Sequence, residues 1–175
     1  MKRQTFTILV AEDDANDQAL IAMAFEKANP KIHIQLVISG QEAIAYLEGR
    51  GAFADRSRYE YPSFIITDLK MPNGDGFSVL ESLKSKPAFV VIPTVVLSGS
   101  ADLDDIQRSY ILGASAYLVK PQALQDLERL LKLLLDFWMA CEVPQVDPAG
   151  KRLQTESRGK LGERFRRRTA RTGSA

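Results

Sequence analysis

The sequence predicts an α/β fold, with a doubly wound parallel β-sheet of five strands and helices on both faces. Two observations carry this prediction. Short β-branched or apolar runs alternate along the chain with segments whose apolar residues recur at helical spacing, which is the order of βαβ units. The strand-like runs are almost continuously apolar, as strands buried on both faces of a sheet must be.

The predicted strands are far enough apart in the sequence for a helix to lie between each consecutive pair. They span Thr7–Ala11, 32–38, Phe64–Thr67, 94–97 and Ala116–Val119. Apolar residues at spacings of three and four predict helices around 20–28, 43–47, 79–83, 103–111 and 122–141. Pro30 and Gly113 stand where the first and fourth helices should end, because proline and glycine commonly terminate helices.

The polar and aromatic stretch 52–62 shows no periodicity, and we interpret it as a long surface loop. Its two tyrosines, Tyr59 and Tyr61, leave two alternatives open. The rings either form a patch that binds a partner or pack the loop onto the edge of the sheet. The sequence favours packing of the loop at least as much as a partner-binding patch.

Composition excludes several classes of protein. The chain is 45% hydrophobic and 26% charged, close to an average globular domain, which excludes disordered and collagen-like chains. No apolar run approaches the roughly 20 residues that a membrane span needs. The single cysteine, Cys141, cannot form an internal disulfide and suits a reducing compartment. We therefore expect a cytoplasmic protein that does not enter a membrane.

The net charge of +1 hides an asymmetry between two parts of the chain. Residues 150–175 contain nine basic and two acidic residues, whereas residues 1–149 contain 14 basic and 20 acidic ones. This pattern predicts a globular domain over 5–143 and a basic tail over 144–175, flexible or partly helical. Such a tail could contact RNA, DNA or an anionic membrane, but a solvated tail is favoured because no recognisable nucleic-acid motif is present.

Acidic residues follow the first and third predicted strands, at the ends where parallel α/β sheets collect their chemistry. Glu12, Asp13 and Asp14 follow the first strand, Asp68 follows the third, and Lys120 follows the fifth. Two carboxylates about 4 Å apart repel each other by about 4 kcal/mol at an effective dielectric near 20. We therefore predict that a hard divalent cation and the Lys120 ammonium compensate this cluster. The alternative, an acidic cap of the first helix, explains Asp14 but not Asp68.

Four motifs, each at the end of a predicted strand, occur together in an order that resembles one protein family. They are ILVAEDD at 8–14, IITDLKMP at 65–72, VLSG at 96–99 and ASAYLVKP at 114–121. Over about residues 5–141 the chain resembles the CheY-like receiver domain of bacterial two-component response regulators, which has the flavodoxin-like strand order 2-1-3-4-5. The long loop before the third strand and the lack of a recognisable output domain resemble the single-domain regulators associated with bacterial phytochromes.

The resemblance implies a phosphoacceptor site. Asp68 would take a phosphoryl group from a phosphohistidine of a sensor histidine kinase, possibly a bacteriophytochrome, and form an acyl phosphate. Asp13 would bind Mg²⁺ directly and Glu12 would bind it through water, while Asp68 and the backbone carbonyl of Lys70 would complete the protein ligands. The protein would be a signalling switch and not an enzyme, since it would catalyse only its own phosphorylation and dephosphorylation.

The resemblance also implies which residues respond to the phosphoryl group. Lys120 would hold one phosphoryl oxygen and the Ser98 hydroxyl another, while Tyr117 would turn inward as Ser98 moves. The peptide bond before Pro121 would be cis, which X–Pro bonds permit. The side chain of Lys70 would place a cation near the acyl phosphate and slow its hydrolysis.

Two other functions compete with this switch. An aspartyl phosphatase commonly carries a second carboxylate two residues after its nucleophile as a general acid, and this chain has Lys70 there. A phosphorylation-independent interaction module would be expected to lack Asp13, Asp68 or Lys120, and all three are present. The phosphoacceptor switch is therefore favoured over both.

The last predicted helix is more apolar than packing on one face of a sheet requires. Its residues at spacings of three and four, as in a coiled-coil seam, are Leu124, Leu127, Leu131, Leu134 and Trp138. Further apolar surface comes from Leu130, Leu133, Leu135 and Phe137. We therefore predict a homodimer through the helix at 122–141. The alternative is that residues after Cys141 fold back and cover the excess.

Overall fold

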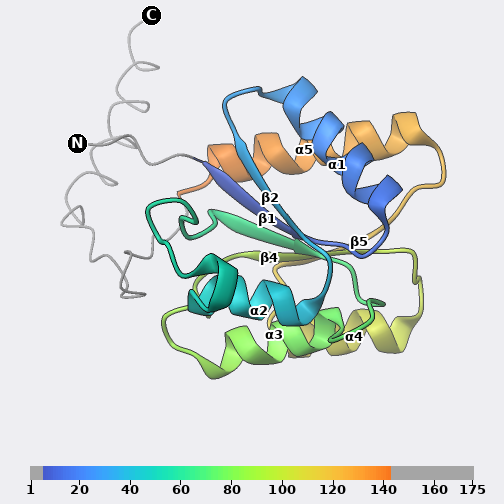
Figure 1. Cartoon of the computed structure of the whole chain (residues 1–175). Helices are drawn as coiled ribbons and strands as arrows, with labels where there is room; N and C mark the ends of the chain where they lie inside the picture. Colours follow the sequence, from blue (N-terminus) through green and yellow to red (C-terminus); the bar gives the residue numbers. More distant parts are fainter. Residues whose placement is uncertain (1–5, 143–175) are drawn as a thin grey trace, which may run out of the picture.

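The computed structural model describes residues 6–142 and contains one parallel sheet with the strand order β2-β1-β3-β4-β5 (Figure 1). The strands are β1 (Thr7–Ala11), β2 (His33–Val37), β3 (Phe64–Thr67), β4 (Thr94–Ser98) and β5 (Ala116–Val119). The predicted fold class and strand order are therefore confirmed. Three strands have the predicted bounds, β2 is shorter by one residue at each end, and β4 gains Ser98.

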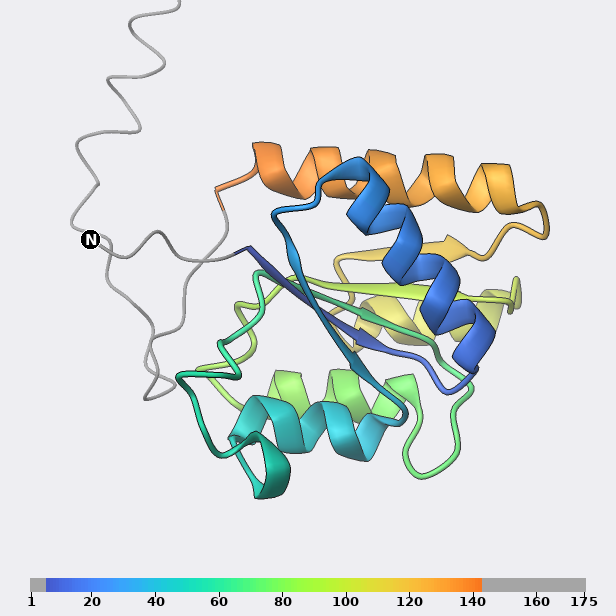
Figure 2. The same cartoon turned by 45° about the horizontal axis from the view of Figure 1, so that its top comes forward.

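Helices cover both faces of the sheet. They are α1 (Ala15–Ala28), α2 (Gly40–Glu48), the short 3-10 helix η1 (Gly51–Phe53), α3 (Gly76–Ser85), α4 (Leu103–Ile111) and α5 (Leu124–Ala140). Figure 2 shows α1 and α5 side by side on one face, with α2, α3 and α4 on the other. Because side chains alternate along a strand, Ile8 and Val10 of β1 pack with α1 and α5, whereas Leu9 and Ala11 pack with α2 and α3.

One arginine holds the loop between α2 and β3. The Arg56 guanidinium donates a hydrogen bond of 2.6 Å to the Tyr46 carbonyl in the last turn of α2. The same group lies over the ring of Tyr61, 4.2 Å from its centroid. The Tyr59 ring packs edge-on against the Tyr46 ring, with centroids 6.0 Å apart. Of the two alternatives for the loop tyrosines, the structure shows the one in which they pack.

Tyr46 connects this loop to the core and sets a limit on stability at alkaline pH. Its hydroxyl donates to the Glu60 carbonyl at 2.5 Å, and its burial raises the pKa of the phenol to about 12. The native state therefore holds this proton more tightly than the unfolded state, in which a tyrosine ionises near pH 10. The stabilisation is complete below about pH 10 and is lost as the pH rises toward about 12.

We expect the free energy of unfolding of the wild type to fall more steeply above about pH 10 than that of Tyr46→Phe. At neutral pH the variant should be less stable by about 1 kcal/mol, because the Glu60 carbonyl loses its donor. Above about pH 10 the difference should shrink, since only the wild type has a phenol to ionise at this position. Urea denaturation of both proteins across this range measures the difference. A difference that does not change with pH would contradict the expectation.

Helix α5 buries most of the residues that resemble a coiled-coil seam. Three of them are buried in the core against the sheet and α1: Leu127, Leu131 and Leu134. Trp138 stacks on the Phe64 ring of β3, with centroids 5.9 Å apart. The prediction that this seam forms a dimer interface is wrong, because the same spacing also describes the apolar stripe of a helix that packs on a sheet. The large apolar residues that α5 exposes are Leu124, Leu133, Phe137 and Met139.

The described residues lie within the predicted domain at 5–143. The predicted tail at 144–175 lies outside the described residues, as does the chain segment after Glu142 that could cover α5. Among the helices of residues 6–142, none has the length and hydropathy needed to cross a membrane.

Candidate functional site

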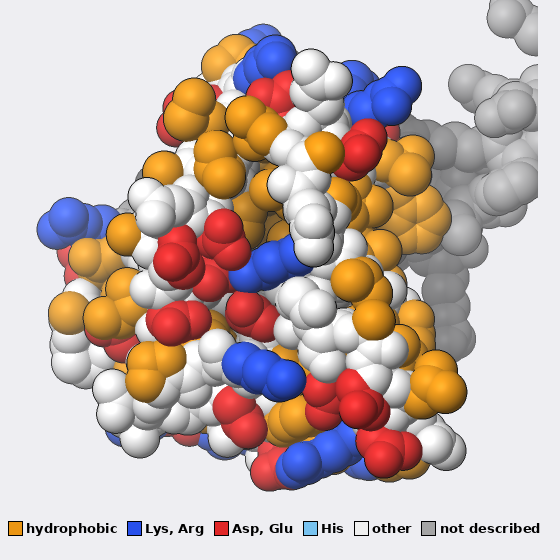
Figure 3. All heavy atoms as spheres, turned by 90° about the vertical axis from the view of Figure 1, so that its right-hand side faces the viewer, with side chains coloured by type: hydrophobic (Ala, Val, Ile, Leu, Met, Phe, Trp, Pro, Cys, Tyr) orange, Lys and Arg blue, Asp and Glu red, His pale blue; other side chains and the backbone are white. Residues whose placement is uncertain are grey.

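The carboxyl ends of β1 and β3 bring three carboxylates together. Ala11 pairs with Thr67 in the sheet, so the next residues along each strand, Glu12 and Asp68, lie beside one another. Carboxylate oxygens of Glu12, Asp13 and Asp68 lie within 4.8 Å of one another. Figure 3 looks onto this edge of the sheet, where acidic side chains gather around basic ones. The predicted clustering is therefore confirmed.

Backbone hydrogen bonds fix the position of Asp68. The Asp68 amide donates to the Ala11 carbonyl at 2.9 Å, which continues the pairing of β3 with β1. Oδ1 of Asp68 accepts from the amides of Leu69 at 2.5 Å and Lys70 at 3.4 Å. The other carboxylate oxygen, Oδ2, accepts from Lys120. One oxygen of Asp68 is thus held by the backbone, while the second faces the charged site.

Burial makes this cluster costly without a counter-charge. Glu12 is 2% exposed, and burial raises its pKa even though hydrogen bonding and charge from Lys120 act in the opposite direction. Asp68 is also buried, whereas Asp13 is exposed at the edge. Hard divalent cations such as Mg²⁺ prefer oxygen ligands and keep several waters. A set of three carboxylates with one exposed member fits such an ion.

Lys120 lies at the centre of the cluster. Its Nζ donates to Glu12 Oε2 at 2.6 Å, to Asp17 Oδ2 at 2.8 Å and to Asp68 Oδ2 at 3.0 Å. Burial alone would lower the pKa of Lys120, but the hydrogen bonds that Lys120 donates to Asp17 and Glu12, together with the charge of Asp68, outweigh burial and raise the pKa. The ammonium therefore stays charged at neutral pH and partly neutralises the three carboxylates.

The peptide bond between Lys120 and Pro121 is trans, and the expectation of a cis bond is wrong. The trans isomer of an X–Pro bond is intrinsically favoured by about 0.5–1 kcal/mol. Lys120 reaches its three carboxylates with the trans bond, and its amide donates to the Ser98 carbonyl at 2.8 Å.

Asp17 is a residue of the site that the sequence patterns do not predict. This residue lies in the first turn of α1, where an acidic side chain is ordinarily explained by the helix dipole. Asp14 already caps this helix, since its carboxylate accepts from the amides of Asn16 at 2.8 Å and Asp17 at 3.0 Å. The cap explanation is therefore right for Asp14 alone, and the carboxylate of Asp17 is left to bind Lys120. Its place one turn after the strand-end acidic residues was the available signal.

Ser98 and Tyr117 lie together beside the loop that follows β4. The Ser98 hydroxyl is buried and accepts from the Ser100 amide at 3.4 Å. The half-buried Tyr117 donates from its hydroxyl to the Ser100 carbonyl at 2.9 Å, and burial raises its pKa. Both side chains therefore contact the same loop, and Lys120, the residue after β5, lies beside Ser98. A movement of this loop would change the hydrogen bonds of both residues.

Lys70 differs from Lys120, the other basic residue of the site, in its exposure and its contacts. Its side chain is exposed and makes no ion pair with any residue in the range 6–142. Its backbone amide donates to Asp68, as described above. The side chain therefore has room to move toward or away from Asp68.

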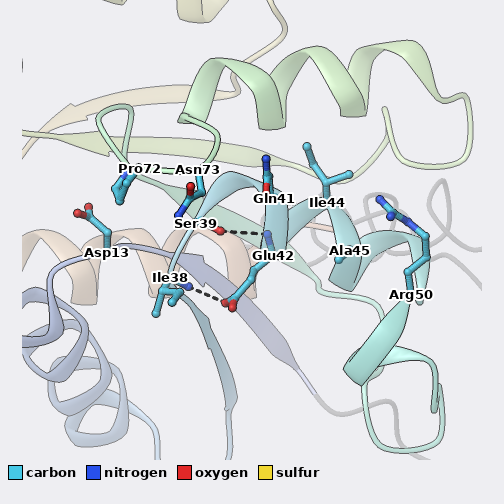
Figure 4. A pocket seen from close by; sticks show the side chains of 10 residues that line it. All are labelled: Asp13, Ile38, Ser39, Gln41, Glu42, Ile44, Ala45, Arg50, Pro72 and Asn73. Atoms are coloured by element: carbon cyan, nitrogen blue, oxygen red, sulfur yellow. Dashed lines mark hydrogen bonds between the residues drawn. The ribbon is translucent and has the colours of Figure 1, made fainter.

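A groove of about 820 Å³ opens beside the acidic cluster (Figure 4). Its lining comes from the ends of β1 and β2, from α2 and from the loop after β3: Asp13, Ile38, Ser39, Gln41, Glu42, Ile44, Ala45, Arg50, Pro72 and Asn73. The Ser39 hydroxyl caps α2 by accepting from the Glu42 amide at 3.2 Å, and the Glu42 carboxylate accepts from the amide of Ile38, the residue before the cap, at 3.0 Å. Asp13 lines both the groove and the cluster, so the site is open to solvent on this side.

Comparison with known proteins agrees with this geometry. Residues 8–132 match the family described as the response regulator receiver domain. A probable methanogenesis regulatory protein, FilR2, of Methanothrix harundinacea is 33% identical over 77% of this chain and 84% of its own length. The response regulator Rcp1 of Synechocystis is 32% identical over 75% of this chain and 88% of its own length.

Two solved structures are similar over nearly their whole length. The phosphorylated cyanobacterial phytochrome response regulator RcpA is 34% identical, with a TM-score of 0.76, over 81% of this chain and all of the other. The Mn²⁺-bound form of Rcp1 is 30% identical, with a TM-score of 0.72, over 79% of this chain and 98% of the other. The part of the chain that carries the acidic cluster lies inside the matched family region.

Proposed function

Because the chain belongs to the response regulator receiver domain family, we propose that it is a signalling switch that accepts a phosphoryl group on Asp68 with Mg²⁺. One observation carries the proposal: the Asp68 carboxylate lies among two further carboxylates and the Lys120 ammonium, 3.0 Å from its Oδ2. An oxygen nucleophile, a cation site and a fixed ammonium are the parts that phosphoryl transfer needs.

The two oxygens of Asp68 have separate tasks in this proposal. Oδ1 is held by the Leu69 amide, so Oδ2 is the oxygen that attacks the phosphorus of a phosphohistidine. As the new P–O bond forms, the P–N bond breaks and its electron pair leaves with the imidazole nitrogen. Lys120 then exchanges its hydrogen bond to Oδ2 for one to a phosphoryl oxygen, and the Ser98 hydroxyl donates to another phosphoryl oxygen. Mg²⁺, held by Glu12, Asp13 and Asp68, would neutralise part of the phosphoryl charge.

A histidine kinase is the proposed phosphoryl donor. The names of similar proteins support a particular kind of kinase, since RcpA is a phytochrome response regulator and its structure is of the phosphorylated form. We therefore propose a bacteriophytochrome as the favoured partner. The similar protein Rcp1 has a Mn²⁺-bound form, which supports the proposal that the cluster of Glu12, Asp13 and Asp68 binds a divalent cation.

We propose that the protein is not an enzyme acting on external substrates. Lys70, two residues after the acceptor, has an ammonium where an aspartyl phosphatase commonly has its general acid. A protonated lysine cannot serve as a base toward water, so the acyl phosphate should persist as a signal. A cytoplasmic location suits this role. Nucleic acid is not a proposed partner, and the basic segment at 144–175 would be its only candidate site.

The mass of the protein tests this function. Incubation of the wild type with Mg²⁺ and acetyl phosphate should add a single phosphoryl group, and Asp68→Asn should add none. Asp75→Asn is a matched control, because Asp75 caps α3 by accepting from the Ser78 amide at 2.8 Å, and asparagine caps equally well. The control should be phosphorylated like the wild type. No adduct on the wild type would favour the phosphorylation-independent interaction module.

We also propose self-association through the outer surface of α5, which differs from the seam suggested by the sequence. Leu133 is 67% exposed and Phe137 is 57% exposed, one turn apart on the same face of the helix. Exposed apolar surface of this kind commonly marks an interface. We expect the wild type to sediment as a dimer and Leu133→Glu as a folded monomer. Leu134→Glu should unfold instead, because Leu134 is buried, and a monomeric wild type would contradict the proposal.

A further inference from the structure

Asp17 connects α1 to the lysine of the phosphoacceptor site. Its Oδ2 lies 2.8 Å from Lys120 Nζ, closer than Asp68 Oδ2 at 3.0 Å. The side chain of Asp17 is 36% exposed, whereas those of Glu12 and Asp68 are buried. Asp17 therefore stands at the outer rim of the cluster and holds Lys120 from the solvent side.

The three carboxylates use all the hydrogen-bonding capacity of Lys120. An ammonium has three N–H donors, and Glu12, Asp17 and Asp68 each accept one. Two of these acceptors also belong to the group that could hold a metal, which consists of Glu12, Asp13 and Asp68 among the described residues. Asp17 is the acceptor of Lys120 that is not a member of that group. A cation bound at the cluster would therefore act on the three hydrogen bonds unequally.

A divalent cation draws on the charge of the Glu12 and Asp68 carboxylates and repels the ammonium beside them. Both effects weaken the hydrogen bonds that these two residues accept from Lys120. The hydrogen bond to Asp17 keeps its full anionic partner, because Asp17 binds no metal. The lysine therefore retains one strong attachment when the metal site is filled.

We propose that Asp17 is a positioning residue that holds the Lys120 ammonium beside the site when Mg²⁺ occupies Glu12, Asp13 and Asp68. The inference rests on the proposed function, since it assigns Asp17 a task in the same site. Asp17 keeps Lys120 within reach of an incoming phosphoryl oxygen and reduces the competition of the ammonium with Mg²⁺ for Glu12 and Asp68. An ordinary helix-dipole role does not account for the contact, because Asp14 already caps α1.

The affinity for Mg²⁺ tests this role without any phosphorylation. In Asp17→Asn the charge of Lys120 is less neutralised and bears more strongly on Glu12 and Asp68, so we expect Mg²⁺ to bind about fivefold more weakly. Asp14→Asn is the matched control, since it removes a nearby exposed charge, keeps the helix cap and does not touch Lys120. It should change the affinity by less than about twofold. Calorimetric titration with MgCl₂ measures all three proteins.

Two further variants separate positioning from a general effect of charge. Asp17→Glu keeps a carboxylate that the flexible stem of Lys120 can follow, so it should restore the affinity to within about twofold of the wild type. In a Lys120→Met background, Asp17→Asn should weaken Mg²⁺ binding no more than Asp14→Asn does. An equal loss with and without Lys120 would overturn the inference, as would wild-type affinity in Asp17→Asn.

Failure of this inference can be told from failure of the proposed function. If Asp68 is phosphorylated but Asp17 and Lys120 show no coupling in Mg²⁺ binding, only the role of Asp17 is wrong. If the coupling is found but no phosphoryl adduct forms, the role of Asp17 at the metal site stands and the phosphoacceptor function fails. A wild type that does not bind Mg²⁺ overturns the role of Asp17 as well.

Discussion

Lys120→Met is expected to lower the rate of phosphorylation by acetyl phosphate about 100-fold or more. The ammonium of Lys120 is 3.0 Å from the oxygen of Asp68 that would attack, and it is the only cation that hydrogen-bonds to Asp68 among the described residues. Removing it leaves the developing negative charge on the phosphoryl group without its protein counter-charge. Methionine keeps the length and much of the apolar stem of lysine, so packing changes little. The time course of the mass of the intact protein gives the rate.

The same variant should bind Mg²⁺ more tightly than the wild type, because the ammonium no longer competes for Glu12 and Asp68. Opposite changes in metal affinity and phosphorylation rate would distinguish loss of a catalytic charge from loss of the fold. Lys84→Met is a suitable control, since Lys84 lies on α3 and donates to the Ile111 carbonyl at 2.9 Å. Its phosphorylation rate should match that of the wild type. A Lys120→Met protein phosphorylated at the wild-type rate would remove Lys120 from the site.

Gly76→Ala is expected to destabilise the protein by roughly 3 kcal/mol, at the upper end of what overpacking costs. A Cβ at this position would lie 2.2 Å from the Asp68 carbonyl oxygen and 3.0 Å from the Cα of Leu69. Both neighbours are backbone atoms of the turn after β3, so neither can rotate away as a side chain could. The Gly76 amide also donates to the Leu69 carbonyl at 3.0 Å, which ties the start of α3 to this turn. Urea denaturation measures the loss.

Gly99→Ala is the matched control for this substitution. A Cβ at Gly99 would meet no atom within 4 Å, and the backbone there does not require glycine. We expect its free energy of unfolding to equal or slightly exceed that of the wild type, because alanine reduces the freedom of the unfolded chain. If both variants were equally stable, the close approach of Gly76 to Asp68 and Leu69 would not be a real constraint. If Gly76→Ala folds, its phosphorylation shows whether a shift of Asp68 is tolerated.

Strand positions could be predicted where apolar runs have clear ends. β1, β3 and β5 lie where their sequence patterns predict, and β1 and β3 end at the acidic residues that form the site. β2 ends one residue before its predicted end. Ile38 is apolar but 57% exposed, and its amide donates a hydrogen bond to the Glu42 carboxylate of α2. A residue that is apolar in type but used by a helix cap cannot be told from a strand residue by periodicity alone.

The site could be predicted in large part for a similar reason. Glu12, Asp68 and Lys120 follow strands at one edge of a parallel sheet, and topology brings such residues together. Asp17 could not be predicted with the same rule, because it lies on a helix, where an acidic side chain in the first turn is common. The role of Asp17 becomes visible only in three dimensions, where Lys120 donates a hydrogen bond to its carboxylate. The cis bond before Pro121 is an expectation that comes from the family resemblance alone, and the structure shows a trans bond instead.

The dimer prediction shows a limit of periodic patterns. Leucines at spacings of three and four fit both a coiled-coil seam and the buried stripe of a helix on a sheet. In α5 the stripe through Leu131 packs in the core, and the excess of apolar residues lies on another face, at Leu133 and Phe137. The amount of apolar surface was informative, whereas the pattern did not say which face is exposed.

Identifying the residue that carries the phosphoryl group is the most direct test of the phosphoacceptor function. Wild-type protein incubated with Mg²⁺ and acetyl phosphate can be reduced with borohydride, which converts the acyl phosphate of an aspartate into homoserine, and then digested and sequenced by mass spectrometry. We predict homoserine at residue 68 alone, and none when Mg²⁺ is chelated. Homoserine at another acidic residue, a phosphoryl group on His33, or labelling that does not depend on Mg²⁺ would contradict Asp68 as the metal-assisted acceptor.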